Sequence, residues 1–312
     1  MGEFELIRRF FLRPPAAGVE LGVGDDCAVL APTPGARWLV SSDMLVEGRH
    51  FLSTVDPGRL GHKALAVNLS DLAACGATPR GFTLAMALPR VDEAWLAGFS
   101  AGLWALADAS GCPLIGGDTT QGPLNLCITV FGEAPAGQAL LRRGARPGDE
   151  VWVSGRLGDA RLALEVFRGT VTLEGRGFDA ARVAMECPTP RLALGQALRG
   201  IATAAIDVSD GLLGDLGHIL AASGVGARLD ADALPRSAVL AAQPVELQRT
   251  CVLAGGDDYE LVFTAPPGAR LPDVGVALTR VGVIEVEPGL RVVDARGERV
   301  DHGLRSFDHF KP

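Results

Sequence analysis

Hydrophobic and polar positions follow two kinds of spacing that alternate along the chain. Longer segments place apolar residues every three or four positions, which predicts helices at residues 58–80, 92–111 and 210–224. Short apolar runs between them, such as "FTLAMALP" at 82–89 and "VWVSG" at 151–155, predict buried strands. Because the two kinds recur from end to end, the pattern predicts layers of mixed α and β structure.

Several predicted strands border turns that are rich in glycine and aspartate. "RWLVSSDMLVEG" (37–48) predicts a strand that enters a polar loop, "GVGDDCAVL" (22–30) the start of a buried strand, and "GGDDYELVFTAP" (255–266) an acidic turn before a strand. The stretch "GARPGDEV" has the proline and glycine of a turn between domains. We therefore expect an N-terminal domain at residues 1–140 and a C-terminal domain at 141–312.

The composition is that of a folded protein, and the length favours two domains, with one large domain as the alternative. The chain has 312 residues, of which 48% are hydrophobic and 21% charged, and this excludes a disordered chain. Its apolar runs are far shorter than the roughly 20 residues that a membrane span requires. Glu3 and Glu5 stand where a signal peptide would be basic. We therefore expect a cytoplasmic protein with no membrane partner.

Charge and cysteine usage narrow the choice of partners and cofactors. The formal net charge of -8 disfavours nucleic acid as a partner, because binding to phosphates needs a basic face. The six cysteines are widely spaced and form no C-x-x-C pair. A zinc site and a disulfide framework are therefore not expected.

Six aspartates stand beside glycine, serine or apolar runs rather than among the mixed charges of a solvated surface. For single members a structural role is sufficient: Asp210 could cap the helix that follows it, and Asp118 could organise a turn. Asp71 is different, because it lies in the middle of a predicted helix, one turn after Asn68 on the same face. The set is Asp26, Asp43, Asp71, Asp118, Asp207 and Asp210.

Convergent carboxylates would repel one another, by about 4 kcal/mol for a pair at 4 Å and an effective dielectric of 20. Such a cluster needs cations, and an all-oxygen site suits Mg²⁺, which commonly binds a few carboxylates together with substrate phosphates. The chain has no G-x-x-x-x-G-K-[ST] loop, and its lysines are only Lys63 and Lys311. "SGRLGDA" (154–160) either holds a phosphate on the amides at a helix start or is a plain turn. This combination favours a nucleotide enzyme that neutralises polyphosphate with metal ions.

Nine motifs together resemble the bacterial thiamine-monophosphate kinases, in order and spacing, from residue 2 to residue 310. They are "GEFELIRRF", "GVGDDCAVL", "SSDMLVEGRHF", "KALAVNLSDLAACGATP", "LIGGDTT", "PTPR", "IDVSDGLLGDLGHI", "GGDDYEL" and "FDHF". The resemblance implies ATP-dependent phosphorylation of thiamine monophosphate to thiamine diphosphate. It also implies a mixed α/β protein with the two-domain aminoimidazole ribonucleotide synthetase-like fold, and a homodimer in which the N-terminal sheets join into a barrel.

The resemblance also assigns roles to residues of this chain. It implies several Mg²⁺ ions held by Asp26, Ser41, Ser42, Asp43, Asp71, Asp118, Asp207 and Asp210, with Asp43, Asp71, Asp118 and Asp210 catalytic. It places ATP against Gly117, Asp118, Arg142 and Ser209, and thiamine monophosphate against His50, Asp257 and Phe307. Two positions depart from the pattern of some relatives, which often have Glu at the position of Asp257 and Tyr or Trp at that of Phe307. Asp25 has no assigned ligand role; it either shapes its turn or supports the metal ligands from behind.

The implied reaction is a direct in-line transfer. The attacking oxygen of the substrate monophosphate already carries negative charge, so no strong base is needed to activate it. Catalysis depends more on aligning the two phosphates and neutralising their charge. One alternative is a synthetase of the same superfamily, although the first 20 residues lack the reactive Cys and Lys of a selenophosphate synthetase. The other is a noncatalytic module that binds Mg²⁺ or nucleotide and forms no ADP.

Overall fold

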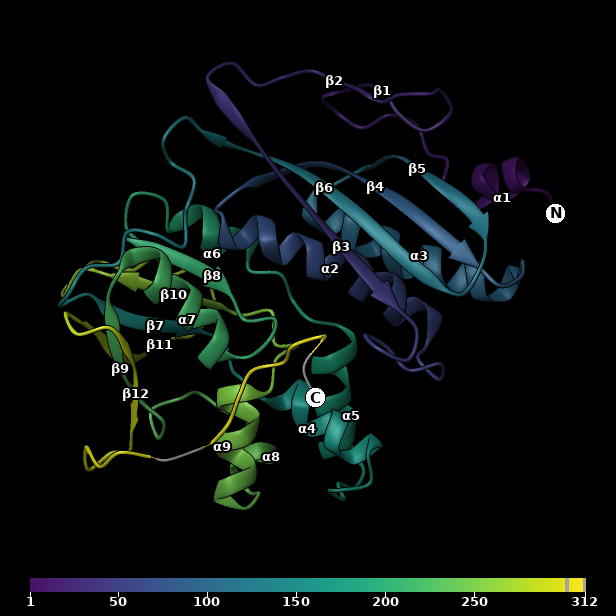
Figure 1. The fold of residues 1–312 in the computed structure, drawn as a ribbon. Coiled ribbons are helices and arrows are strands. Elements are labelled where there is room, and N and C mark those ends of the chain that lie inside the picture. The colour runs from purple at the N-terminus through teal and green to yellow at the C-terminus, as the bar shows by residue number, and fades with distance from the viewer. Residues whose placement is uncertain (301–302, 311–312) are drawn as a thin grey trace. The chain divides into compact units, whose positions relative to one another are not determined.

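The computed structural model describes residues 1–300 and 303–310 and divides the chain into two units (Figure 1). The N-terminal unit comprises residues Met1–Leu72 and Ala77–Gly137. The C-terminal unit comprises Ala73–Gly76 and Gln138–Pro312. Each unit has its own sheet and its own layer of helices, as the alternating sequence pattern predicts.

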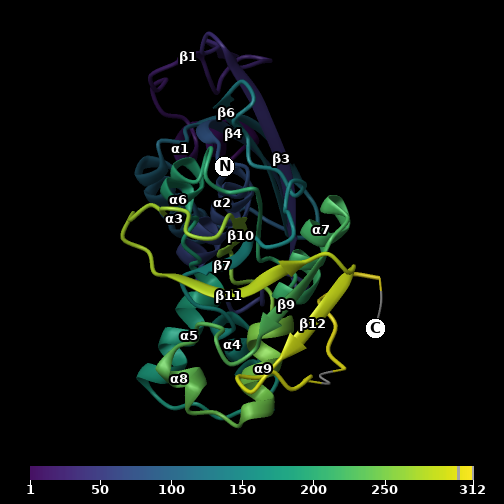
Figure 2. The same ribbon diagram turned by 90° about the vertical axis from the view of Figure 1, so that its left-hand side faces the viewer.

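The N-terminal unit is built on a four-stranded sheet with the strand order β3-β6-β4-β5. The strands are β3 (Ala36–Val46), β6 (Asn125–Pro135), β4 (Thr78–Leu88) and β5 (Leu114–Gln121), and β4 and β5 are parallel. Helices α2 (Pro57–Ala74) and α3 (Glu93–Ser110) lie along one face of the sheet (Figures 1 and 2). The remaining elements are α1 (Glu3–Phe10) and the short β1 (Val19–Leu21) and β2 (Val29–Leu30).

Glycines allow the two long helices of this unit to approach closely. A Cβ atom on Gly102 of α3 would lie 1.8 Å from the carbonyl oxygen of Gly58 in α2, a distance that no side chain tolerates. The ends of α3 follow from local signals: the Asp92 carboxylate accepts the N–H of Trp95 at 3.1 Å, and Gly111 ends the helix with φ of 62°. The expected helix at 92–111 is confirmed.

The C-terminal unit is built on a six-stranded sheet with the order β12-β9-β11-β7-β10-β8. Figure 2 shows β11 and β12 on either side of β9. The strands are β7 (Glu150–Ser154), β8 (Ala204–Asp207), β9 (Gly226–Asp230), β10 (Leu261–Ala265), β11 (Leu278–Glu285) and β12 (Gly289–Val293). The helices are α4 (Asp159–Phe167), α5 (Arg176–Glu186), α6 (Leu192–Ala197), α7 (Leu212–Ser223), α8 (Ala238–Ala241) and α9 (Val245–Ala254).

The C-terminal core matches the predicted apolar stripe. Leu212, Leu216, Ile219 and Leu220 of α7 are buried against the sheet, and Gly224 ends the helix in the left-handed region, with φ of 66°. The expected strand "VWVSG" is confirmed as β7. Periodicity was therefore sufficient to find this helix and this strand.

Three local predictions were wrong. The helix expected at 58–80 ends at Ala74, and Pro79 lies in β4 because that stretch pairs with β6. Residues 22–30 do not begin a buried strand: the last two form β2, whose Val29 is exposed and which pairs with the short β1. Asp43 and Asp118 do not lie in turns but within β3 and β5, because backbone pairing carries each strand through its aspartate.

The cysteines should differ sharply in reactivity. Cys27 is exposed, whereas Cys112 and Cys251 are fully buried, and burial raises the pKa of each buried thiol to about 12. Because the thiolate is the reactive form, a thiol reagent at pH 8 should modify Cys27 and spare Cys112 and Cys251 until the protein is denatured. Peptide mass spectrometry measures this, and modification of Cys112 in the native protein at the rate of Cys27 would contradict it.

The described residues were also tested for membrane spans. No helix within 1–300 and 303–310 combines the length and apolar character needed to cross a bilayer.

Candidate functional site

One group of predicted ligands lies where β3 meets α2 in the N-terminal unit. The hydroxyl of Ser41 donates a short hydrogen bond to the carboxylate of Asp71, 30 positions away in sequence. One turn earlier on α2, the side-chain oxygen of Asn68 accepts the backbone N–H of Asp43 at 2.9 Å. Asn68 and Asp71 thus face the same strand, as their helical spacing predicts. We call Ser41, Asp43, Asn68 and Asp71 the β3 group.

Ser42 and His50 lie close to this group along the chain. The Ser42 hydroxyl contacts the carbonyl of Ile128 at 3.1 Å and the hydroxyl of Thr129 at 3.0 Å, both on β6. Just after β3, Nδ1 of His50 accepts the backbone N–H of Val46 at 3.0 Å. Because Nδ1 accepts this bond, the neutral ring carries its proton on Nε2.

A second group lines a pocket of about 410 Å³ in the N-terminal unit. Asp26, Gly117 and Asp118 contribute its polar side, and Phe4 and Ile7 of α1 contribute apolar walls. Asp25 also lines the pocket, and its carboxylate accepts the N–H of Asp26 at 2.8 Å, which is the turn-shaping contact expected of it. We call Asp26, Gly117 and Asp118 the β5 group.

The two groups lie at opposite edges of the four-stranded sheet. In the strand register, Asp43 of β3 pairs with Ile128, Ile128 pairs with Leu84, and Leu84 pairs with Gly117 of β5. Three steps between neighbouring strands amount to roughly 14 Å. One Mg²⁺ ion, with metal–oxygen distances of about 2.1 Å, is too small to join Asp43 and Asp118 of one sheet across that span.

The C-terminal unit presents four of its predicted residues on three adjoining segments outside the helices and strands. Asp207 is buried at the end of β8, and the loop of residues 209–211 follows it. The backbone N–H of Asp257 donates to the carbonyl of Ser209 at 2.7 Å, and that of Phe307 donates to the carbonyl of Asp210 at 3.0 Å. Four of the predicted ATP, metal and substrate residues therefore meet at one place within this unit.

Arg142 and Phe307 are both exposed in this unit. The carbonyl of Leu141, one residue before Arg142, accepts the N–H of Ala205 in β8 at 3.0 Å, so the exposed Arg142 runs beside the strand that carries Asp207. The Phe307 ring is exposed and meets the His309 ring edge-on at 4.8 Å between centroids. An exposed aromatic face can stack on a ligand ring.

The structure corrects the helix-capping role considered for Asp210. The N-cap of α7 is Gly211, and no side chain caps it. The buried carboxylate of Asp215 instead bonds the N–H groups of the preceding loop. Burial raises the pKa of Asp215 to about 7, and the charge of Asp210 adds to this rise. The sequence held a signal for it, because Asp215 falls on the apolar stripe between Leu212 and Ile219.

The loop that carries Asp257 is anchored by buried charges that the sequence interpretation missed. Asp257 and Tyr259 both have positive φ, 63° and 52°, a conformation that side chains rarely adopt. Glu260 next to them is 6% exposed and forms a bidentate ion pair with Arg191, with 2.7 Å between Nε and Oε2. The Ser154 hydroxyl donates to the same carboxylate at 2.5 Å. This explains the arginine of the "PTPR" motif as an anchor for the loop.

The structure favours the plain-turn interpretation of "SGRLGDA". At the start of α4, the N–H of Leu157 is bonded to Pro235, and the N–H of Gly158 is bonded to the carboxylate of Asp258 at 2.8 Å. Burial raises the pKa of Asp258 well above its ordinary range. With these two amides occupied and the acidic side chain of Asp159 beside them, the turn is poorly suited to a phosphate.

The donors present suit Mg²⁺ rather than a transition metal. In the parts of the chain that the structure describes, no three His, Cys, Asp or Glu side chains form a group that could hold a metal ion by themselves. Mg²⁺ does not require such a cage, since it usually takes one or two carboxylates and completes its shell with water and substrate phosphates. Small groups of carboxylate and hydroxyl oxygens, such as the β3 group, fit that coordination.

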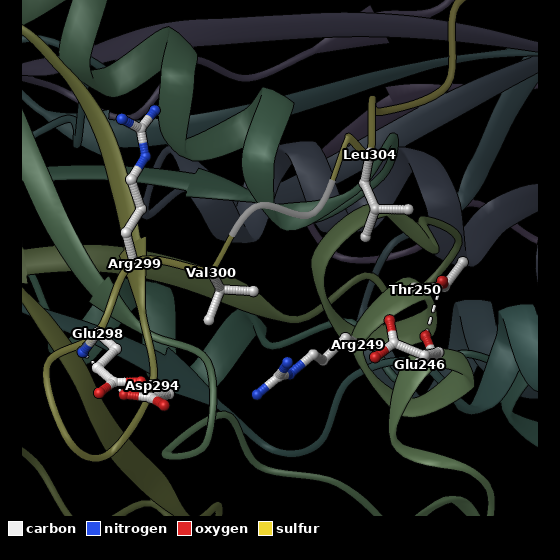
Figure 3. Close-up of a pocket in the computed structure, with 8 residues that line it drawn as sticks. All are labelled: Glu246, Arg249, Thr250, Asp294, Glu298, Arg299, Val300 and Leu304. Atoms are coloured by element: carbon white, nitrogen blue, oxygen red, sulfur yellow. Dashed lines mark hydrogen bonds between the residues drawn. The ribbon is translucent and has the colours of Figure 1, made fainter.

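A further pocket, of about 240 Å³, involves none of the predicted residues (Figure 3). Arg249 points from α9 towards the segment that carries Asp294 and Glu298. The walls of this pocket contain two arginines and three carboxylates. Their charges nearly cancel, so the pocket would select neither an anion nor a cation.

Comparison with known proteins identifies the family. The model of the AIR synthase related protein N-terminal domain matches residues 24–134, and that of the C-terminal domain matches 146–293. Thiamine-monophosphate kinase from Salmonella typhimurium (strain LT2) is 46% identical over 321 residues, which cover 99% of this chain and 98% of the relative. The chain belongs to the thiamine-monophosphate kinase family. The Escherichia coli (strain K12) member is 44% identical, with 99% and 98% covered.

Solved structures of the thiamine-monophosphate kinase family share the fold. The crystal structure of thiamine-monophosphate kinase from Stenotrophomonas maltophilia K279a matches with a TM-score of 0.85 and 44% identity, over 91% of this chain and 93% of that chain. AaThiL complexed with AMPPCP and TMP matches with a TM-score of 0.79 and 29% identity, over 90% and 89%. The expected two-domain α/β fold is confirmed, while the dimeric barrel stays a prediction.

Proposed function

We propose that this protein transfers the γ-phosphoryl group of ATP to thiamine monophosphate and forms thiamine diphosphate and ADP. The observation that carries this proposal is the identity of 46% with a thiamine-monophosphate kinase over nearly the full length of both chains. A related structure holds AMPPCP and TMP, the first an analogue of ATP. The clustering of Asp207, Ser209, Asp210, Asp257 and Phe307 in one unit adds support.

In the proposed reaction, a phosphate oxygen of thiamine monophosphate attacks the γ-phosphorus of ATP. The new oxygen–phosphorus bond forms as the bond to ADP breaks, and no covalent enzyme intermediate is needed. The chain's task is to align two anionic groups and exclude water. Mg²⁺, when bound, supplies positive charge that offsets the repulsion between them.

The roles of the residues in this reaction remain proposals. Mg²⁺ takes its protein oxygens from Asp26, Ser41, Ser42, Asp43, Asp71, Asp118, Asp207 and Asp210. ATP contacts Gly117, Arg142 and Ser209. His50, Asp257 and Phe307 bind thiamine monophosphate, with the Phe307 ring against the ring of the substrate. A cytoplasmic location also stays a prediction.

The proposal is tested by incubating purified protein with ATP, Mg²⁺ and either thiamine monophosphate or thiamine, with chromatography of both product classes. We expect equal amounts of ADP and thiamine diphosphate, and only from the monophosphate. A protein that binds ATP tightly but forms no diphosphate would instead be a binding module. ADP formed without thiamine diphosphate would point to a different acceptor.

We further propose a homodimer whose sites combine residues of both copies. Alternate residues of β3, which share one face of the strand, form an exposed apolar row of Trp38, Val40, Met44 and Val46. Exposed apolar rows of this kind mark protein interfaces. Within one copy, the β3 group and the β5 group lie at opposite edges of the same sheet. If the sheets of two copies pair, Asp43 of one copy can approach Asp118 of the other.

The interface prediction is tested by placing charges in the row. Val40→Glu with Met44→Glu should convert the dimer to a monomer, because a buried unpaired carboxylate is strongly unfavourable. Sedimentation velocity measures the change. Val183→Glu is the matched control, since Val183 is exposed on α5 of the other unit and should have no effect on assembly. A wild-type protein that is monomeric would refute the prediction.

The shared site is tested by mixing two inactive chains. If Asp43 and Asp118 act across the interface, a dimer of one Asp43→Asn chain and one Asp118→Asn chain has one intact site and about half of the wild-type turnover. If each chain holds a complete site, the mixed dimer is as inactive as either parent. Co-expression with two different tags isolates the mixed dimer for the assay.

A further inference from the structure

The loop between β8 and α7 is held by one buried carboxylate. A single oxygen of Asp215, Oδ2, accepts the N–H groups of Ser209 at 3.1 Å, Asp210 at 3.2 Å and Gly211 at 3.1 Å. Asp215 is only 3% exposed and lies in the first turn of α7. Its side chain therefore points back beneath the loop that leads into its own helix.

The same loop is held from its other side through its carbonyl groups. The carbonyl of Ser209 accepts the N–H of Asp257, and the carbonyl of Asp210 accepts that of Phe307, as described above. The carbonyl of Gly211 accepts the Ser306 hydroxyl at 3.1 Å. Two peptide units, Ser209–Asp210 and Asp210–Gly211, are thus bonded at both the carbonyl and the amide, so flipping either one would break two bonds at once.

A carboxylate at this position has a physical advantage over a neutral side chain. Hydrogen bonds to a charged acceptor are roughly twice as strong as neutral ones. Three amide donors converge on one oxygen and offset part of the cost of its burial. Each buried N–H left without a partner would lower the stability of the folded protein by about 1–3 kcal/mol. The loop therefore needs this acceptor to keep its shape.

We propose that Asp215 is a positioning residue for nucleotide binding: by holding the amides of residues 209–211, it directs the side chains of Ser209 and Asp210 towards ATP and its metal ion. This inference rests on the proposed function, which places those two side chains at ATP. Asp215 itself contacts no substrate, because its carboxylate is occupied beneath the loop.

A purely structural carboxylate would give a different result, and the chain contains a matched control. Asp149, in the same unit, is 4% exposed and accepts the N–H of Arg146 at 2.9 Å and the hydroxyl of Thr203 at 2.7 Å. None of these residues belongs to the predicted site. Asp149→Asn therefore weakens a comparable buried network without touching the loop at 209–211.

The experiment compares Asp215→Asn, Asp215→Ala and Asp149→Asn in the full-length protein. Steady-state kinetics give KM and kcat for Mg-ATP and KM for thiamine monophosphate, calorimetry gives the Kd of ADP with Mg²⁺, and thermal unfolding gives Tm. For Asp215→Asn we expect both KM for ATP and Kd for ADP to rise about ten-fold or more, the equivalent of one charged hydrogen bond. For Asp149→Asn we expect a lower Tm with both nucleotide constants unchanged within about two-fold.

The inference is overturned if Asp215→Asn lowers Tm and leaves nucleotide binding at the wild-type value. It is also overturned if Asp149→Asn weakens nucleotide binding as much as Asp215→Asn does. A general loss of stability in the C-terminal unit would then explain both results. Should Asp215→Ala not fold, the near-isosteric Asp215→Asn carries the comparison. Should the wild type form no thiamine diphosphate, the Kd of ADP still tests Asp215, so the two proposals fail separately.

Discussion

Replacing Asp71 with asparagine should reduce turnover by at least about 100-fold, the scale seen when one charge-stabilising group is lost from a reaction centre. Asparagine has nearly the same size and can still accept the hydroxyl bond from Ser41, so the contact between α2 and β3 persists. The negative charge that would attract Mg²⁺ is lost. We therefore expect kcat to collapse at saturating ATP and Mg²⁺ while Tm changes little.

The control for this prediction is Asp108→Asn. Asp108 is an exposed aspartate of the other long helix, α3, and its carboxylate pairs with the exposed Arg13. It should keep the wild-type kcat, because surface pairs contribute little. The metal-cluster interpretation of the β3 group would be wrong if a folded double variant, Asp43→Asn with Asp71→Asn, retained near-normal turnover.

Replacing Arg191 with alanine should lower the free energy of unfolding by about 3–5 kcal/mol, because it leaves a buried carboxylate without its cation. Glu260 is 6% exposed, so its carboxylate would stay buried after losing both hydrogen bonds of the guanidinium. Urea denaturation followed by circular dichroism measures the change. The effect should be far larger than that of Arg9→Ala, which breaks an ion pair whose two side chains are each 54% exposed and which should cost at most about 1 kcal/mol.

The double variant Arg191→Ala with Glu260→Ala separates the causes. Removing both partners leaves no isolated charge, so the loss should be smaller than that of Arg191→Ala alone plus Glu260→Ala alone. Strict additivity would show that the two side chains do not act as a pair. A loss below about 1 kcal/mol for Arg191→Ala would mean that Glu260 gains solvent or another partner, contrary to its burial here.

The sequence by itself determined the features that depend on neighbours a few residues apart. Helix α3 could be placed almost to the residue, because its cap residues Asp92 and Gly111 and its apolar spacing are all local. The shared face of Asn68 and Asp71 followed from helical geometry alone. The family could be recognised in the same way, because its motifs are short stretches of adjacent residues. Their order can be read directly from the linear sequence.

Only the tertiary structure decided which distant segments meet. Ser41 beside Asp71 and Arg191 beside Glu260 join residues that are 30 and 69 positions apart, and no local pattern selects such partners. Asp118 lies within a strand because β4 pairs with β5, although its flanking glycines resemble a turn. Asp215 supports its own preceding loop because folding buries it there. Periodicity encodes which face of an element is buried, whereas the partner on that face depends on how the elements pack.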